Sequence, residues 1–172
     1  MDQDLITLSK KIGGVLTNHH LSLATAESCT GGLLSHVLTG VSGSSQYFMG
    51  GIVAYSNHIK TAILSVQSDT MDKYGAVSSQ TAAEMAEGIR KLFHTDIGLS
   101  TTGIAGPTGG TPEKPVGLVW TGISTPQSTQ TRKNFFEGHR NQVKTSTVHQ
   151  ILLNLLDDLS TQLDNTENKN GK

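Results

Sequence analysis

The sequence is poor in cysteine and in charge. Its 172 residues contain a single cysteine, Cys29, so no intramolecular disulfide can form and a disulfide-stapled secreted domain is excluded. Charged residues make up only 16%, and 13 basic residues against 14 acidic ones give a net charge of -1. That balance argues against a protein that binds nucleic acid by neutralising its phosphates.

Long apolar runs and metal-binding spacings are also missing. No stretch approaches the ~18 apolar residues of a membrane-spanning helix. The N-terminus, with Asp2 and Asp4 ahead of Leu5, lacks the basic flank and apolar stretch of a signal peptide. Neither H-E-x-x-H nor C-x-x-C occurs, so we expect no metal and no cofactor. These absences predict a cytoplasmic protein that makes no contact with membranes.

What the sequence does contain is an alternation of helices and strands. Apolar periodicity and turn residues predict helices over 3–19, 33–38, 58–64, 79–93 and 141–163. They predict strands over 21–26, 47–55, 96–102, 116–124 and 129–137. This order favours a three-layer α/β/α sandwich, and the two adjacent strands near the end favour a mixed, largely parallel sheet. Residues 1–163 form one predicted domain, and the polar segment 164–172 a disordered tail.

A serine stands where a predicted strand turns into a helix, in the run Glu27-Ser28-Cys29-Thr30-Gly31-Gly32. Such a turn can present a nucleophile, because the first N–H groups of a helix are unpaired and can stabilise an oxyanion. A simple helix cap is the commoner reason for this pattern. Cys29 competes as nucleophile, since a helix N-terminus lowers a thiol pKa, but a lone cysteine is more often a core residue. The pattern favours Ser28.

A serine nucleophile needs a proton acceptor, and Lys60 is the candidate. It falls in the first turn of a predicted helix capped by Asn57, where the positive helix end disfavours a charged amine. A lysine held neutral can act as a general base, and Tyr55, at a predicted strand end, could relay or orient the proton. The alternative is a solvated surface lysine beside a packed tyrosine.

Glycine and proline crowd the segment 103–115, which follows a predicted strand. Successive N–H groups in such a turn can bind phosphate or carboxylate, although no Walker A motif is present. Lys114 could add positive charge to this loop. Arg140, at the start of the last predicted helix, would add a fixed cation to an anion site. An ordered surface loop explains the glycines equally well.

Taken together, these segments resemble the C-terminal domain of the CinA (competence/damage-inducible) family over about residues 5–160. The resemblance rests on six ordered blocks: Thr25-Ala26-Glu27-Ser28-Cys29-Thr30-Gly31-Gly32, Gly43-Ser44-Ser45, Tyr55-Ser56-Asn57 with Lys60, Gly75-Ala76-Val77-Ser78, Thr102-Gly103-Ile104-Ala105-Gly106-Pro107 with Gly109-Gly110, and Lys114-Pro115-Val116-Gly117. Each block alone is weak evidence, and the ordered set is specific.

The resemblance implies an activity and a site. Stand-alone members of the family hydrolyse nicotinamide mononucleotide to nicotinate mononucleotide and ammonia, a step in pyridine nucleotide salvage. It therefore implies an amidohydrolase without a metal, in which Ser28 is the nucleophile and acts with Lys60 and Tyr55. The N–H groups of Cys29, Thr30 and Gly31 are the expected oxyanion hole. The expected substrate-binding residues are Gly32, Ser44, Ser45, Thr102, Gly103, Ala105, Gly106, Gly109, Gly110 and Arg140. The family also implies a homo-oligomer, a dimer or trimer.

One corner departs from the family pattern. Deamidases of this family tend to carry Gly-Asp-Arg and a second arginine one turn later, whereas this chain has Gly138-His139-Arg140 and then Lys144. Lysine cannot offer the bidentate fork of arginine. Two alternatives therefore stay open: a catalytically inactive module that binds or senses nucleotides, and an amidase for a different nucleotide amide.

Overall fold

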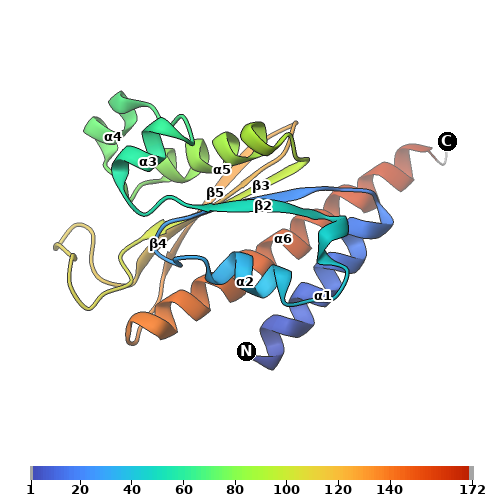
Figure 1. The fold of residues 1–172 in the computed structure, drawn as a ribbon, viewed down its shortest axis with the longest axis horizontal. Coiled ribbons are helices and arrows are strands. Elements are labelled where there is room, and N and C mark those ends of the chain that lie inside the picture. The colour runs from blue at the N-terminus through green and yellow to red at the C-terminus, as the bar shows by residue number, and fades with distance from the viewer. Residues whose placement is uncertain (1, 171–172) are drawn as a thin grey trace.

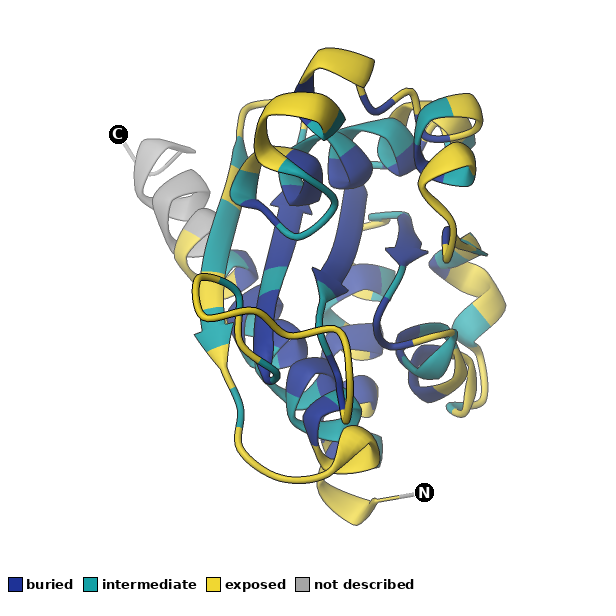
Figure 2. Cartoon of the chain, turned by 90° about the vertical axis from the view of Figure 1, so that its left-hand side faces the viewer, coloured by how far each residue is buried: buried dark blue, intermediate teal, exposed yellow. Residues whose placement is uncertain are grey.

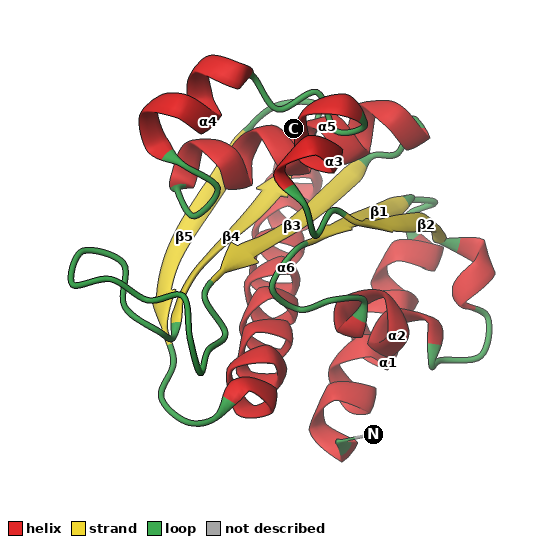
Figure 3. Ribbon diagram, turned by 60° about the vertical axis from the view of Figure 1, so that its left-hand side comes forward, coloured by secondary structure: helices red, strands yellow, loops and turns green. Residues whose placement is uncertain are grey.

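A five-stranded sheet lies between two layers of helices in the computed structural model, which describes the backbone of residues 2–170 and the side chains as far as Thr161. Helices α3, α4 and α5 cover one face, and α1, α2 and α6 cover the other (Figures 1 and 3). The strands are β1 (Leu23–Glu27), β2 (Phe48–Val53), β3 (Ile97–Gly103), β4 (Leu118–Ser124) and β5 (Thr129–Phe135). The helices are α1 (Gln3–Asn18), α2 (Leu33–Thr39), α3 (Asn57–Ala62), α4 (Ser68–Tyr74), α5 (Ser79–Phe93) and α6 (Arg140–Asn170), with a short 3-10 helix, η1 (Ser44–Gln46). The predicted α/β/α sandwich is confirmed.

The sheet is mixed, in the order β2-β1-β3-β4-β5. Strand β1 is parallel to both β2 and β3, whereas β4 runs antiparallel to β3 and β5. The carboxyl ends of β1, β2 and β3 therefore meet at one edge of the sheet. In open α/β sheets ligands bind at this edge, and the segments after these three strands contain Ser28, Tyr55 and the glycine loop.

The central strands β1, β3 and β4 are buried on both faces, as the dark ribbons at the centre of Figure 2 show, whereas the edge strands β2 and β5 carry exposed residues. On one side the apolar faces of α1 and α6 pack together, and on the other Met85 and Ile89 of α5 cover the small residues of β1. Glycines let α5 lie directly on the sheet, because a Cβ on Gly98 would lie 2.1 Å from the carbonyl oxygen of Ala86. Each large apolar side chain buried in these clusters contributes about 2 kcal/mol to stability.

Three details differ from the sequence prediction. Helix α4 was not predicted; it is short, and a side chain from another helix caps it, because Glu84 of α5 accepts from the N–H of Gln67. Helix α3 is capped by Ser56 rather than by Asn57, which is the first residue of the helix itself. Helix α6 continues through Asn170, beyond the predicted end at residue 163. Of the predicted tail, residues 171 and 172 lie outside the described residues.

Candidate active site

Ser28 lies on a turn between β1 and α2. Its N–H donates to the carbonyl oxygen of Thr101 (2.9 Å), which extends the β1–β3 pairing by one residue beyond Glu27. Gly31 and Gly32 follow with φ of 62° and 94°, a left-handed backbone that favours glycine. Because of these two residues the chain turns before α2 begins at Leu33.

Three N–H groups of this turn have no hydrogen-bond acceptor on any other described residue. These are the backbone N–H groups of Cys29, Thr30 and Gly31, and none of them donates to a carbonyl or side-chain acceptor of another described residue. Unpaired N–H groups beside a nucleophile are the donors that an oxyanion requires. The structure thus brings the predicted oxyanion-hole residues next to Ser28.

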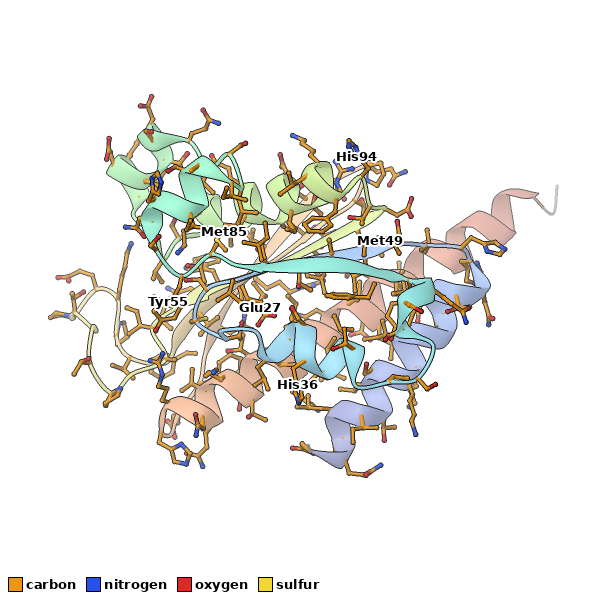
Figure 4. All side chains as sticks on the ribbon, in the orientation of Figure 1. Glu27, His36, Met49, Tyr55, Met85 and His94 are labelled. Atoms are coloured by element: carbon orange, nitrogen blue, oxygen red, sulfur yellow. The ribbon has the colours of Figure 1, made fainter. Side chains whose placement is uncertain are left out.

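The carboxylate of Glu27 holds the same turn from inside the protein, and sequence analysis gave it no role. It is fully buried and lies between the sheet and the first turn of α2 (Figure 4). It accepts five hydrogen bonds, from Thr30 Oγ1 (2.7 Å), Gly32 N (2.9 Å), Leu34 N (3.0 Å), Ser35 N (2.8 Å) and Ser35 Oγ (2.6 Å). The available signal was a single acid directly after the predicted strand 21–26, which contains no charged residue, since an acidic group at the end of a buried strand needs partners.

Lys60 is buried against the serine. Its side chain is 1% exposed, and its Nζ atom lies 3.1 Å from Ser28 Oγ. The amine also donates to the carbonyl oxygen of Ala54 (2.7 Å). The described residues contain no carboxylate that pairs with it. Burial therefore lowers the pKa of Lys60 from its ordinary value of 10.5.

This geometry confirms the proximity of Lys60 to Ser28 but corrects the reason for the low pKa. Lys60 belongs to the last turn of the six-residue α3, not to the positive end of a longer helix. The main cause is desolvation by burial. The alternative of a solvated surface lysine is wrong, because the side chain is buried.

Tyr55 is hydrogen-bonded to Arg140 rather than to the Ser28–Lys60 pair. The side chain is 62% exposed, and its hydroxyl accepts a hydrogen bond from Arg140 Nη2 (2.8 Å). Arg140 Nη1 donates at the same time to the carbonyl oxygen of Gly106 (2.8 Å). One guanidinium thus joins the segment after β2, the glycine loop and the start of α6. Within the described structure, no hydrogen bond links Tyr55 to Ser28 or Lys60.

A cavity of about 240 Å³ opens beside the serine turn. Its lining comes from the turn, the glycine loop and α6: Ser28, Cys29, Tyr55, Gly103, Ile104, Ala105, Gly106, Thr108, Gly109 and Arg140. This set contains a cation and no carboxylate, so the cavity suits an anionic ligand. A larger hollow of about 540 Å³, between residues 63–67 and α5, contains none of the predicted site residues.

Some of the residues predicted to bind the substrate do not line this cavity. Ser44 and Ser45 belong to η1, which precedes β2, so the structure places them at the opposite end of that strand from Tyr55. The hydroxyl of Thr102 donates to the carbonyl oxygen of Ala76, and Gly32 N donates to Glu27. Two further residues lie outside the cavity lining: Gly110, which packs against Val116, and Lys114, which donates to the carbonyl oxygen of Tyr74.

The corner that departs from the family pattern lies against the serine turn. The Nζ atom of Lys144 lies 3.6 Å from the position that a Cβ on Gly31 would occupy. The neighbouring Val143 is fully buried in a cluster with Cys29, Ala105 and Val119, so the start of α6 is packed onto the turn. Lys144 therefore adds a positive charge beside the N–H groups of the serine turn.

Cys29 is placed as a core residue. Burial raises the pKa of its thiol to about 12, so the thiolate is scarce at neutral pH. We expect iodoacetamide to label the native protein far more slowly than the urea-unfolded protein, as followed by intact mass. We also expect Cys29→Ala to keep activity within about threefold and to cost roughly 1 kcal/mol of stability. Rapid labelling of the native protein, or loss of activity in Cys29→Ala, would contradict this placement.

Comparison with known proteins supplies the family. The model of the CinA C-terminal domain matches residues 5–159. The chain belongs to the CinA family. The CinA domain is 55% identical over 134 residues to a putative competence-damage inducible protein of Thermoanaerobacter pseudethanolicus, covering 78% of this chain and 32% of that protein. The corresponding protein of Moorella thermoacetica is 47% identical, with 91% and 38% covered. The CinA domain thus spans about a third of the length of these curated relatives.

Solved structures of the family share the whole fold. A competence/damage inducible protein from Agrobacterium tumefaciens superposes on the CinA domain with a TM-score of 0.89 at 36% identity, covering 93% of this chain and 98% of that one. A CinA superfamily protein from Escherichia coli gives a TM-score of 0.86 at 33% identity, with 91% of each chain covered. Within the described residues, no helix of the CinA domain is long and apolar enough to cross a membrane.

Proposed function

We propose that this CinA-family domain is a serine–lysine amidohydrolase that converts nicotinamide mononucleotide and water into nicotinate mononucleotide and ammonia. The observation that carries the proposal is the Ser28–Lys60 pair, in which a buried amine lies 3.1 Å from a serine oxygen and pairs with no carboxylate of the described residues. A nucleophilic serine needs an adjacent base, and a lysine becomes such a base when its environment keeps it neutral.

In the first half-reaction Lys60 acts as the base. The neutral amine donates one hydrogen to the Ala54 carbonyl oxygen, which leaves its lone pair free for the hydroxyl proton of Ser28. Ser28 Oγ bonds to the carboxamide carbon, and the proton moves to Lys60 Nζ. The carbonyl oxygen becomes an oxyanion, for which the free N–H groups at positions 29–31 are the proposed donors.

The second half-reaction restores the enzyme. The C–N bond breaks as Lys60 returns its proton to the leaving nitrogen, which departs as ammonia and leaves an acyl-serine. Lys60, neutral again, removes a proton from water, whose oxygen attacks the acyl carbon. The second tetrahedral intermediate collapses to nicotinate mononucleotide, and the proton returns to Ser28 Oγ. Every proton transfer then passes through one nitrogen.

The cavity supports a substrate with a negative group. We assign the phosphate to Arg140 and the N–H groups of the glycine loop, where Gly103, Gly106 and Gly109 let a ligand approach the backbone. The positively charged pyridinium ring makes the amide carbon of the substrate more electrophilic. Tyr55, which Arg140 orients, remains in the proposed catalytic set as the group that faces the substrate from the segment after β2.

Ammonia release from the purified chain tests this assignment directly. We expect turnover of nicotinamide mononucleotide and, because Arg140 would lose its anionic partner, a value of kcat/KM at least about 10²-fold lower for nicotinamide riboside. Tight binding of the nucleotide without ammonia release would favour the nucleotide-sensing module instead. Turnover of another nucleotide amide with nicotinamide mononucleotide inert would assign a different substrate to the same Ser28–Lys60 pair.

A further inference from the structure

The carboxylate of Glu27 is the most heavily hydrogen-bonded side chain near the site, and the proposed reaction does not use it. It lies directly before the nucleophile in the chain, is completely buried and accepts all five donors within 3.0 Å. Oε2 takes the three from Thr30, Gly32 and Leu34, and Oε1 takes the two from Ser35. A carboxylate offers about four lone-pair sites, so its capacity is fully used.

We infer that Glu27 is a positioning residue that shapes the oxyanion hole of the serine turn. The inference rests on the proposed function, because it concerns the same nucleophile and the same N–H donors. Glu27 acts on the reaction through the backbone that it holds and does not touch the substrate, since it is absent from the cavity lining.

The pattern of donors explains how this happens. Glu27 accepts hydrogen bonds from the backbone N–H groups of Gly32, Leu34 and Ser35. The N–H groups at positions 29–31 have no acceptor on another described residue. Glu27 thereby fixes the end of the turn, including the left-handed Gly31-Gly32 pair, and leaves the start of the turn available to a ligand. Without the carboxylate, the first N–H groups of α2 would be unpaired and would compete for the same acceptors.

The network also fixes the turn to the sheet. Thr30 Oγ1 is shared between Glu27 and Thr101 Oγ1 (2.7 Å), and Ser35 Oγ between Glu27 and Thr25 Oγ1 (2.8 Å). Strands β1 and β3 and helix α2 therefore meet at this one carboxylate. Oxyanion donors must be held to within about 0.5 Å of the productive position. A turn that several buried hydrogen bonds fix to two strands and a helix meets this requirement.

The charges of the donors matter as well. All five are backbone N–H or hydroxyl groups, and in the described structure no cation pairs with Glu27. The negative charge is thus satisfied without drawing Lys60 into an ion pair, which would keep that amine protonated. Uncharged donors to Glu27 are compatible with a neutral base beside Ser28.

Glu27→Gln tests the inference, with Glu84→Gln as a matched control. Glutamine keeps the shape but replaces one acceptor oxygen with a donor NH2 that faces other donors. Glu84 also caps a helix, through Gln67 N and Thr70 Oγ1, but it belongs to α5 and lies outside the cavity lining. The readouts are kcat and KM for ammonia release, the rate at which a fluorophosphonate labels Ser28, and Tm.

We expect Glu27→Gln to lower kcat and the labelling rate by about 10²-fold, the effect of losing an oxyanion donor, with KM within about threefold. Glu84→Gln should lower Tm while both rates per folded molecule stay within about twofold. Equal small effects of the two substitutions on the rates would overturn the inference. Should wild-type protein label but release no ammonia from nicotinamide mononucleotide, the proposed substrate fails while the role of Glu27 is still measured by labelling.

A milder substitution covers the case in which Glu27→Gln does not fold. Ser35→Ala keeps the carboxylate and removes one of its five donors, on a residue outside the cavity. We expect the labelling rate to fall by about three- to tenfold, in keeping with partial loss of preorganisation. An unchanged labelling rate in Ser35→Ala would then count against Glu27 as a positioning residue.

Discussion

Ser28→Ala is expected to reduce kcat for amide hydrolysis by about 10⁴-fold or more, because Ser28 carries the hydroxyl beside Lys60, whereas burial keeps the thiol of Cys29 in the same lining protonated. KM should change little, since the Ser28 hydroxyl contributes to bond making rather than to holding the nucleotide. The fold should be unaffected, because the backbone N–H of residue 28, and not its side chain, pairs with Thr101. Ammonia release and circular dichroism measure the two effects.

Ser42→Ala is the control for this experiment. Ser42 is exposed in the loop between α2 and η1, so its hydroxyl should be dispensable. A second check is covalent: a fluorophosphonate should add to the wild-type chain once, at residue 28, and not at all to Ser28→Ala. Turnover that survives in Ser28→Ala would rule out the acyl-serine.

Lys60→Met is expected to lower kcat/KM by about 10³-fold, the typical contribution of a positioned general base. Methionine fills most of the buried space but cannot accept a proton. In wild-type protein, kcat/KM should fall as the pH drops through the lowered pKa of Lys60, because the protonated amine has no lone pair for the hydroxyl proton. The residual activity of Lys60→Met should lose this acidic limb, whereas Lys91→Met, at an exposed lysine, should retain it.

Stability should respond to the same group in the same direction, but over a higher range of pH. Burial holds the folded-state pKa of Lys60 below the unfolded value, near 10.5. As the pH falls below 10.5, the unfolded chain takes up a proton that the folded chain does not bind, and the free energy of unfolding decreases. Lys60→Met removes this contribution, so its urea-unfolding free energy should depend less on pH above the folded-state pKa. An identical pH dependence in both proteins would mean that the amine is not kept neutral by the fold.

Much of the fold follows from periodicity in the sequence. The apolar stripes of helices α1 and α5 and the apolar residues of strands β1 and β3 are strong local patterns. In the structure these residues pack together in buried clusters. Helix α4 has no such pattern. The N–H of its N-cap residue, Gln67, donates to Glu84, which lies 17 residues later in another helix, so local reasoning could not find it.

The candidate site was predictable only in part, and for physical reasons. Ser28 is identifiable because a strand–turn–helix junction has a local signature. Its place near a helix start made Lys60 a candidate and the family resemblance gave it a role, whereas its burial depends on tertiary packing, which no spacing shows. Ser44 and Ser45 were grouped with the site because they form one of the family motifs, although they precede β2 and so lie at the end of that strand opposite to Tyr55.

The two sides of the candidate site differ in how deeply their residues are buried. Ser28, Glu27 and Lys60 are fixed by buried contacts at the ends of parallel strands, so few substitutions there are compatible with folding. The opposite wall belongs to the long exposed connection between β3 and β4, much of which protrudes from the body of the molecule (Figure 3). Thr108, which lines the cavity, and residues 111–113 are exposed and lie between the family motifs, so they can diverge at small thermodynamic cost, and a family built on this framework can change what it accepts while keeping how it reacts.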